Sequence, residues 1–262
     1  MERIALLVAS LCYLSGFGVT LFALGAGRFR PGRFDLLAMG LGAAFQTWYL
    51  LLKGGALHAC PIGTPADTLV FLSWSTALIY LVIGPAYRLS LMGAFTAPLV
   101  LVLQIGGLLL PGEASTPGLF RPEPWVEAHA ALSLVAFGAF GLAGISGVMF
   151  LIQEGQLKSR RPAPIFHHLP PITDLDRATL RLVLIGLILL TAGFATGLLS
   201  RGSVQSGKYG FSLVIWLLYS GILAGSRAGL LVGRRLAAAT AAAFLLSLGL
   251  LPVIEHLSRS HR

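Results

Sequence analysis

Eight apolar stretches, each close to the length that crosses a bilayer, divide the chain. A bilayer has a hydrocarbon core of about 30 Å, and a helix needs about 20 residues to cross it. The stretches cover residues 4–26, 35–52, 66–86, 90–111, 125–152, 179–199, 209–226 and 236–256. They are continuously apolar and lack the alternating pattern of a membrane β-barrel. Because backbone groups in lipid must be hydrogen-bonded within the protein, we expect all eight stretches to be helices.

The loops between these stretches are short, and none is large enough to hold a second domain. We therefore expect an all-α fold, a polytopic integral membrane bundle of about eight transmembrane helices, with residues 1–262 as a single domain. Composition supports this class of protein, because 56% of the residues are hydrophobic and only 11% are charged. A soluble domain carries about 25% charged residues.

The charges in the loops predict the orientation. Twelve of the 19 Lys and Arg residues fall in loops that share one side, 27–34, 87–89, 153–181 and 227–235. The other seven lie on the opposite side. Because basic loops stay in the cytoplasm, we expect both termini to face outward from the plasma (inner) membrane. The same rule explains the net charge of +9 without nucleic-acid binding.

Four stretches, taken in order, resemble a known family. They cover residues 60–99, 128–158, 169–197 and 212–235, and the segment LPPITDLDR at the entry to the sixth span is a specific part of the match. Together they are similar to the cytochrome c assembly family, in its branch of eight-helix CcsA- and HemX-like membrane proteins. The resemblance implies that the protein binds or handles haem at the outer face of the membrane for delivery to apocytochrome c.

The resemblance also implies a site. Family members carry two outward-facing histidines on either side of a tryptophan-rich loop between spans six and seven. His129 matches the first histidine, and His256 or His261 matches the second. The orientation derived from the loop charges independently puts all three on the outer side. Since imidazole is a common axial ligand of haem iron, His129 and His256 are the predicted iron ligands of a transient bis-histidine site.

Each of these histidines also has an ordinary explanation. His129 could be an interfacial histidine bonded to lipid headgroups or to a backbone carbonyl. His256 could be a polar helix end, although the neighbouring Glu255 could also orient its ring by a hydrogen bond. Lys208 and Arg201, on the same side, could pair either with haem propionates or with lipid phosphates.

The chain departs from the family pattern in the loop that should be rich in tryptophan. Residues 200–210 contain no tryptophan, and only Lys208 matches the end of the family's Trp-Asp-Pro-Lys stretch. A histidine that full synthase members carry within span seven is Ala224 here. These departures favour an assembly factor over an enzyme that attaches haem, and they place the chain closer to the HemX-like members.

The remaining polar residues have structural interpretations. Asp35 and Asp67 begin spans two and three, where the helix dipole favours a negative charge. Cys60 and His58 are expected to be loop residues. Isolated polar groups inside the spans are expected to join helices through hydrogen bonds. These are Gln46, Thr47, Gln104 and Thr191.

Two functions of different classes follow. The first is a haem-binding protein of cytochrome c biogenesis that works with a maturation partner subunit. The alternative is a HemX-like membrane regulator of tetrapyrrole biosynthesis that acts on glutamyl-tRNA reductase without transferring haem. In that case the basic cytoplasmic loop 153–178 would be the contact surface.

Overall fold

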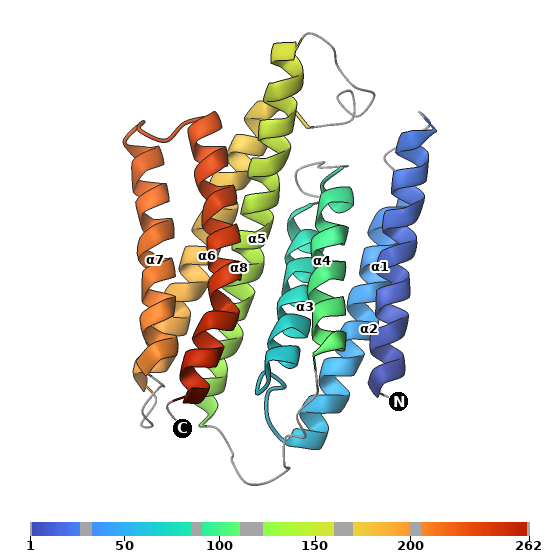
Figure 1. Cartoon of the computed structure of the whole chain (residues 1–262), viewed down its shortest axis with the longest axis vertical. Coiled ribbons are helices and arrows are strands. Elements are labelled where there is room, and N and C mark those ends of the chain that lie inside the picture. Colours follow the sequence, from blue (N-terminus) through green and yellow to red (C-terminus); the bar gives the residue numbers. More distant parts are fainter. Residues whose placement is uncertain are drawn as a thin grey trace.

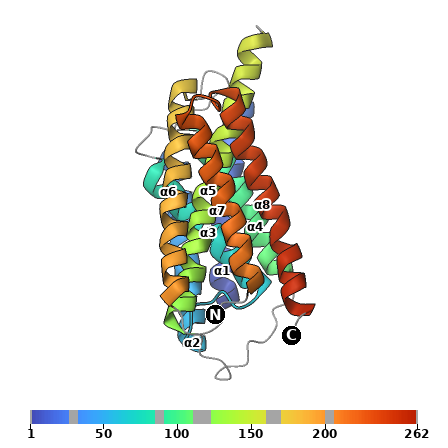
Figure 2. The same ribbon diagram turned by 90° about the vertical axis from the view of Figure 1, so that its left-hand side faces the viewer.

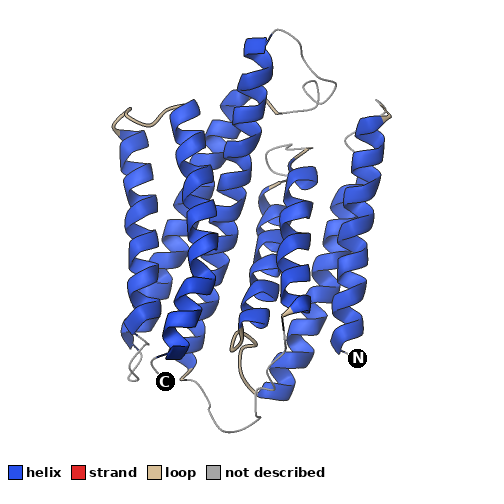
Figure 3. Cartoon of the chain, in the orientation of Figure 1, coloured by secondary structure: helices blue, strands red, loops and turns tan. Residues whose placement is uncertain are grey.

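The structure is a computed structural model that describes residues 2–26, 33–84, 91–110, 123–159, 170–199 and 206–260. Side chains are described for residues 3–26, 34–84, 91–110, 123–158, 170–199 and 210–250. Helices are the only regular secondary structure in these ranges (Figure 3). They are α1 (Glu2–Gly25), α2 (Arg33–Leu57), α3 (Pro65–Ile83), α4 (Met92–Leu109), α5 (Pro124–Ser159), α6 (Ile172–Leu199), α7 (Ser206–Arg227) and α8 (Arg234–Ser260).

The predicted eight helices are confirmed. Seven of them, α1 to α7, are long and apolar enough over their described residues to cross a membrane, so the chain is a polytopic helical membrane protein. The side chains of α8 are described only as far as Leu250. The main differences from the predicted spans are at α5, which continues to Ser159, and at α6, which already begins at Ile172.

The helices form two groups of four (Figure 1). Helices α1–α4 make up one half of the bundle and α5–α8 the other, and α3 packs against α5 where the halves meet. Figure 2 shows the second half from the side, with its helices running along the same long axis. The start of α1 and the end of α8 lie at one end of the bundle, as an even number of crossings requires (Figure 1). We call this the outer end, following the predicted orientation.

Local sequence signals explain several helix ends. Thr64 caps α3, because its side chain accepts a hydrogen bond from the backbone N–H of Asp67 at 3.2 Å, and Pro65 occupies the first helical position. At the end of α2, His58 has a left-handed φ of 51° and the N–H of Ala59 donates to the carbonyl of Gly54 at 3.3 Å. This is the Schellman pattern, in which glycine is the usual residue at the His58 position.

Polar side chains join the helices of the first half, as predicted. The Gln46 amide on α2 accepts from the Tyr13 hydroxyl of α1 at 2.8 Å and donates to the Val70 carbonyl of α3 at 2.9 Å. Gln104 on α4 donates to the Leu6 carbonyl of α1 at 2.9 Å. Each amide is fully buried, so these bonds fix the helices relative to one another in a region without water.

The two threonines predicted to join helices have the same role. Thr47 accepts a hydrogen bond from the indole N–H of Trp74 at 2.8 Å, which connects α2 to α3. Thr191 accepts from the indole N–H of Trp216 at 2.9 Å, which connects α6 to α7.

Small residues let α5 approach its neighbours closely. A Cβ added at Gly138 would lie 2.7 Å from the Ser75 hydroxyl oxygen of α3, and one added at Gly147 would collide with the backbone of Ala237 on α8. The Ser75 hydroxyl donates to the Leu134 carbonyl of α5 at 3.2 Å. Close helix contact through glycine is typical of membrane bundles, and here it lets α5 pack both against α8 in its own half and against α3 in the other.

Candidate functional site

His129 lies in the second turn of α5, near the outer end of the bundle, and only 6% of it is exposed. Its Nδ1 is 2.8 Å from the carbonyl oxygen of Gly193 on α6. Because a carbonyl oxygen can only accept, Nδ1 must carry the hydrogen. In the neutral ring Nε2 is then the nitrogen with the lone pair. The ring centroid of His129 is 6.3 Å from that of Phe194, at an interplanar angle of 44°.

A glycine allows the close contact between α5 and α6 at this point. A Cβ on Gly193 would lie 3.3 Å from the Ser133 hydroxyl oxygen and 3.5 Å from the His129 carbonyl oxygen. The Ser133 hydroxyl donates to that carbonyl at 2.7 Å, and the Thr196 hydroxyl donates to the Gly193 carbonyl at 2.7 Å. These contacts hold the histidine and its acceptor in place from both helices.

His129 is thus bonded to a backbone carbonyl. A histidine with no haem role could also make this bond. The same contact is also common among ligating histidines, which usually donate the second ring N–H to a carbonyl or carboxylate that fixes the ring. The chemistry of the ring thus fits an axial ligand that would use Nε2.

The side chains of the other predicted site residues lie outside the described residues. The backbone of His256 belongs to α8 and that of Lys208 to α7, but the side chains of both lie outside the described residues. Arg201 and His261 are outside the described residues altogether. The start of α5 and the end of α8 lie at the same end of the bundle, as the predicted histidine pair requires (Figure 1). The bis-histidine arrangement and its propionate partners stay predictions.

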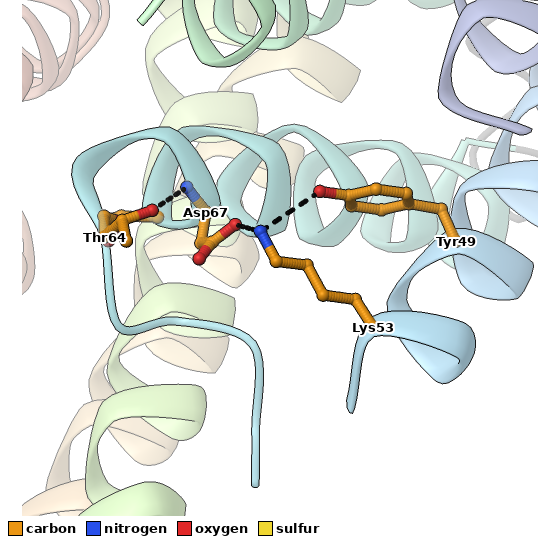
Figure 4. A network of polar contacts seen from close by, with 5 residues as sticks. Tyr49, Lys53, Thr64 and Asp67 are labelled. Atoms are coloured by element: carbon orange, nitrogen blue, oxygen red, sulfur yellow. Dashed lines mark hydrogen bonds and ion pairs between the residues drawn. The ribbon is translucent and has the colours of Figure 1, made fainter. Parts of the chain in front are cut away.

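A buried ion pair at the outer end was not expected from the sequence. The Lys53 ammonium of α2 contacts the Asp67 carboxylate of α3 and lies 3.4 Å from the Tyr49 hydroxyl (Figure 4). Asp67 is 2% exposed and Lys53 is 23% exposed. Asp67 does lie in the first turn of its helix, as predicted. Its carboxylate, however, is paired with Lys53, and Thr64 supplies the cap.

The loop between α2 and α3 lies close to the start of α5. Cys60 in this loop is a half-buried free thiol. Burial raises its pKa, and the negative charge of Glu127 on α5 raises it further. His58 and Cys60 are loop residues, as predicted. The outer end therefore brings the Lys53–Asp67 pair, the Cys60 loop and the start of α5 into one region.

The other carboxylate expected at the start of a span, Asp35, lies in the first turn of α2, at the opposite end of the bundle. Its Oδ2 accepts a hydrogen bond from the Tyr80 hydroxyl of α3 at 3.3 Å. Gly93 of α4 packs directly against this carboxylate, and a Cβ there would overlap it. Asp35 therefore joins α2, α3 and α4 in addition to its place at a helix N-terminus.

The eight-helix bundle with a buried outer-end histidine defines a class, the polytopic membrane proteins. Comparison with known sequences narrows this class, because the family model described as cytochrome C assembly protein matches residues 63–254. The chain belongs to the cytochrome c assembly protein family.

Three individual relatives share between 23% and 30% sequence identity with this chain. The chain is 30% identical to an uncharacterized 28.8 kDa protein of Azospirillum brasilense, over 62% of this chain and 59% of that protein. It is 27% identical to protein HemX of Brevibacillus brevis, over 63% of this chain and 61% of the relative. It is 23% identical to the cytochrome c biogenesis protein CcsA of Microcystis aeruginosa, over 62% of this chain and 66% of the relative. The matches thus span about three fifths of the length of these curated relatives.

Proposed function

We propose that this protein binds haem at the outer face of the plasma (inner) membrane and passes it on during cytochrome c biogenesis. Haem is the cargo of this process and leaves with the apocytochrome. The observation that carries the proposal is the hydrogen bond from His129 Nδ1 to the Gly193 carbonyl, because it orients the ring and makes Nε2 the nitrogen whose lone pair could bind iron.

The remaining parts of the site are proposed on the family pattern. His256 is the second iron ligand, and Lys208 and Arg201 are the cations that pair with the haem propionates. A maturation partner subunit receives the haem. The chain has no tryptophan in residues 200–210 to cover a porphyrin face, which favours carriage of haem over catalysis of its attachment.

The visible absorption spectrum of the purified, dithionite-reduced protein tests this proposal. We expect the sharp bands of low-spin haem in the wild type, and their loss or change in His129→Ala and His256→Ala, because each substitution removes one axial ligand. Ser146→Ala is a matched control, since it removes a hydroxyl that also joins α5 to α6, at the Leu175 carbonyl, away from His129. A wild-type protein that carries no haem and takes up none when haem is added would overturn the proposal.

That negative result would favour the second candidate function, a HemX-like regulator that acts on glutamyl-tRNA reductase from the membrane. The relative named HemX and the missing tryptophans support it. The inner end of the bundle offers a contact surface, because α5 projects beyond its neighbours there (Figure 1). The C-terminal end of α5 and the N-terminal end of α8 lie at the inner end of the bundle. They expose the cations Lys158 and Arg234, which both pair with Glu154.

A further inference from the structure

The Lys53–Asp67 pair leaves one hydrogen-bond acceptor, an oxygen of the Asp67 carboxylate, unsatisfied. One carboxylate oxygen, Oδ1, contacts the Lys53 ammonium, while the other, Oδ2, is buried with no hydrogen-bond partner among the described residues. A buried carboxylate oxygen without a donor is costly, more so at the edge of a membrane. The pair therefore lacks one donor group, and Figure 4 shows this second oxygen pointing away from Lys53.

In the described part of the chain, no other charged group at this end donates a hydrogen bond to this oxygen. Around Asp67, the titratable residues of the outer end in the described part of the chain are Tyr49 on α2, His58 and Cys60 in the loop, Arg3 on α1, Glu123 just before α5, and Glu127 and His129 on α5. Helix α4 has no titratable residue between Met92 and Leu109. Tyr49 contacts the ion pair through Lys53.

Charge limits the kind of ligand that can complete this site. Lys53 and Asp67 together are neutral, so a further carboxylate would leave a net negative charge in a poorly hydrated place. A carboxyl group that arrives with one proton avoids this cost. It can accept a hydrogen bond from the Lys53 ammonium and donate its own proton to Asp67 Oδ2, as two carboxyl groups do when they share a proton.

We propose that Lys53 and Asp67 bind a carboxyl group of the haem cargo together with one proton taken from water. This inference rests on the proposed function: haem carries two propionates, of which Lys53 and Asp67 take one while Lys208 and Arg201 pair with the other. Lys53 is the binding residue that is reached from the outer surface, and Asp67 is the acceptor for the shared proton. No bond to iron is involved, and the ammonium keeps its protons throughout.

The geometry of the bundle places this pair near the proposed haem ligand. Helices α3 and α5 both begin at the outer end and run in the same direction (Figure 1). The Ser75 hydroxyl of α3 is hydrogen-bonded to the Leu134 carbonyl of α5, and each of these residues lies about ten residues after the start of its helix. Asp67 is two turns before Ser75, and His129 is somewhat more than one turn before Leu134. The two groups therefore lie at similar depths on neighbouring helices.

Binding of metal-free protoporphyrin IX to the full chain in zwitterionic lipid nanodiscs tests the inference without iron. The dissociation constant is measured by fluorescence between pH 7 and pH 9, beside that of the dimethyl ester. We expect the constant for the diacid to rise about tenfold per pH unit, because one proton is bound with each ligand. The ester has no ionised carboxyl group, so its constant should not change with pH. This comparison needs no variant.

Two substitutions assign the effect to the pair. Asp67→Asn removes the proton acceptor and leaves Lys53 as an uncompensated cation, so we expect tight binding of the diacid with no pH dependence. Lys53→Met should weaken binding of the diacid by about ten- to a hundredfold. Thr64→Ala is the matched control, because it removes the cap of α3 while both charges stay in place. It should keep the pH dependence of the wild type.

A purely structural ion pair gives a different pattern. Lys53→Met and Asp67→Asn would then weaken binding equally, for acid and ester alike, and this result would overturn the inference. A pH dependence that persists in Asp67→Asn would also overturn it, because another group such as His58 would then bind the proton. Failure of the proposed function is distinguishable, since it appears as missing haem bands in the wild type whatever the substitutions at Lys53 and Asp67 do.

Discussion

At the scale of single residues, the outer end combines a strained loop with buried charge. His58 adopts a left-handed conformation in which glycine is usual, and Cys60 follows two residues later beside Glu127. The thiol of Cys60 is consequently a sensitive reporter of this region, because its reactivity depends on the fraction present as thiolate.

The rate of alkylation should show this dependence. Burial and the Glu127 charge raise the Cys60 pKa, so the thiolate fraction at pH 8 is lower than that of a free cysteine and grows as the pH rises. In a Cys12→Ser background, Glu127→Gln should lower the pKa and speed alkylation at pH 8 by about two- to threefold. Iodoacetamide labelling followed by mass spectrometry measures the rate.

Glu154→Gln provides the control for this experiment. Glu154 lies near the far end of α5, so its removal should leave the Cys60 rate unchanged. Equal rates in Glu127→Gln and the wild type would show that the start of α5 does not approach the loop.

The sequence could reveal some of these residues and not others. The position of His129 at the outer end followed from the motif and the loop charges together. Its contact with Gly193 could not be predicted, because it depends on how α5 and α6 pack. Lys53 and Asp67 are 14 residues apart on two helices. Lys53 falls one residue beyond the predicted end of its span at residue 52, because α2 continues to Leu57.

At the scale of elements, the contact between α3 and α5 depends on Gly138. A methyl group at this position would lie 2.7 Å from the Ser75 hydroxyl oxygen and 3.0 Å from its backbone carbon. Backbone cannot move aside as easily as a flexible side chain, so Gly138→Ala should destabilise the protein by about 1–3 kcal/mol. The thermal unfolding midpoint in detergent measures this effect.

Gly155 on the same helix is the matched control. A Cβ there meets nothing within 4 Å, so Gly155→Ala should be neutral or stabilising by up to about 1 kcal/mol through helix propensity. Equal losses of stability in both variants would mean that the α3–α5 contact does not depend on the missing side chain.

The presence of each helix could be predicted from the length and apolarity of its segment alone. The residues at which the helices end could not always be predicted in this way. The predicted limits of the seventh span, 209–226, are close to those of α7, because charged and small polar residues flank the span. α5 runs past its apolar segment, and an ion pair between Glu154 and Lys158, 2.7 Å apart, supports its last turns. Hydrophobicity cannot predict such an extension, since the added turns are polar.

At the scale of the whole molecule, the orientation in the membrane is the prediction on which the functional argument depends. Single cysteines at Gly63 and Leu230 test it in a background without Cys12 and Cys60, because both positions are exposed and lie at opposite ends of the bundle. In intact spheroplasts, a membrane-impermeant maleimide should label Gly63→Cys. It should label Leu230→Cys only after the membrane is permeabilised. The reverse pattern would put His129 on the cytoplasmic side.

The division into two halves has a consequence for synthesis at the ribosome. α3 and α5 are not consecutive, so their contact can form only after α4 has crossed the membrane and α5 has followed it. The first four helices can meanwhile associate through the buried amides of Gln46 and Gln104. We therefore expect the side of α3 that later contacts α5 to face lipid during this interval. The first half, with the α3 surface that contacts α5, is therefore in the membrane before α5 and can receive it as the second half inserts.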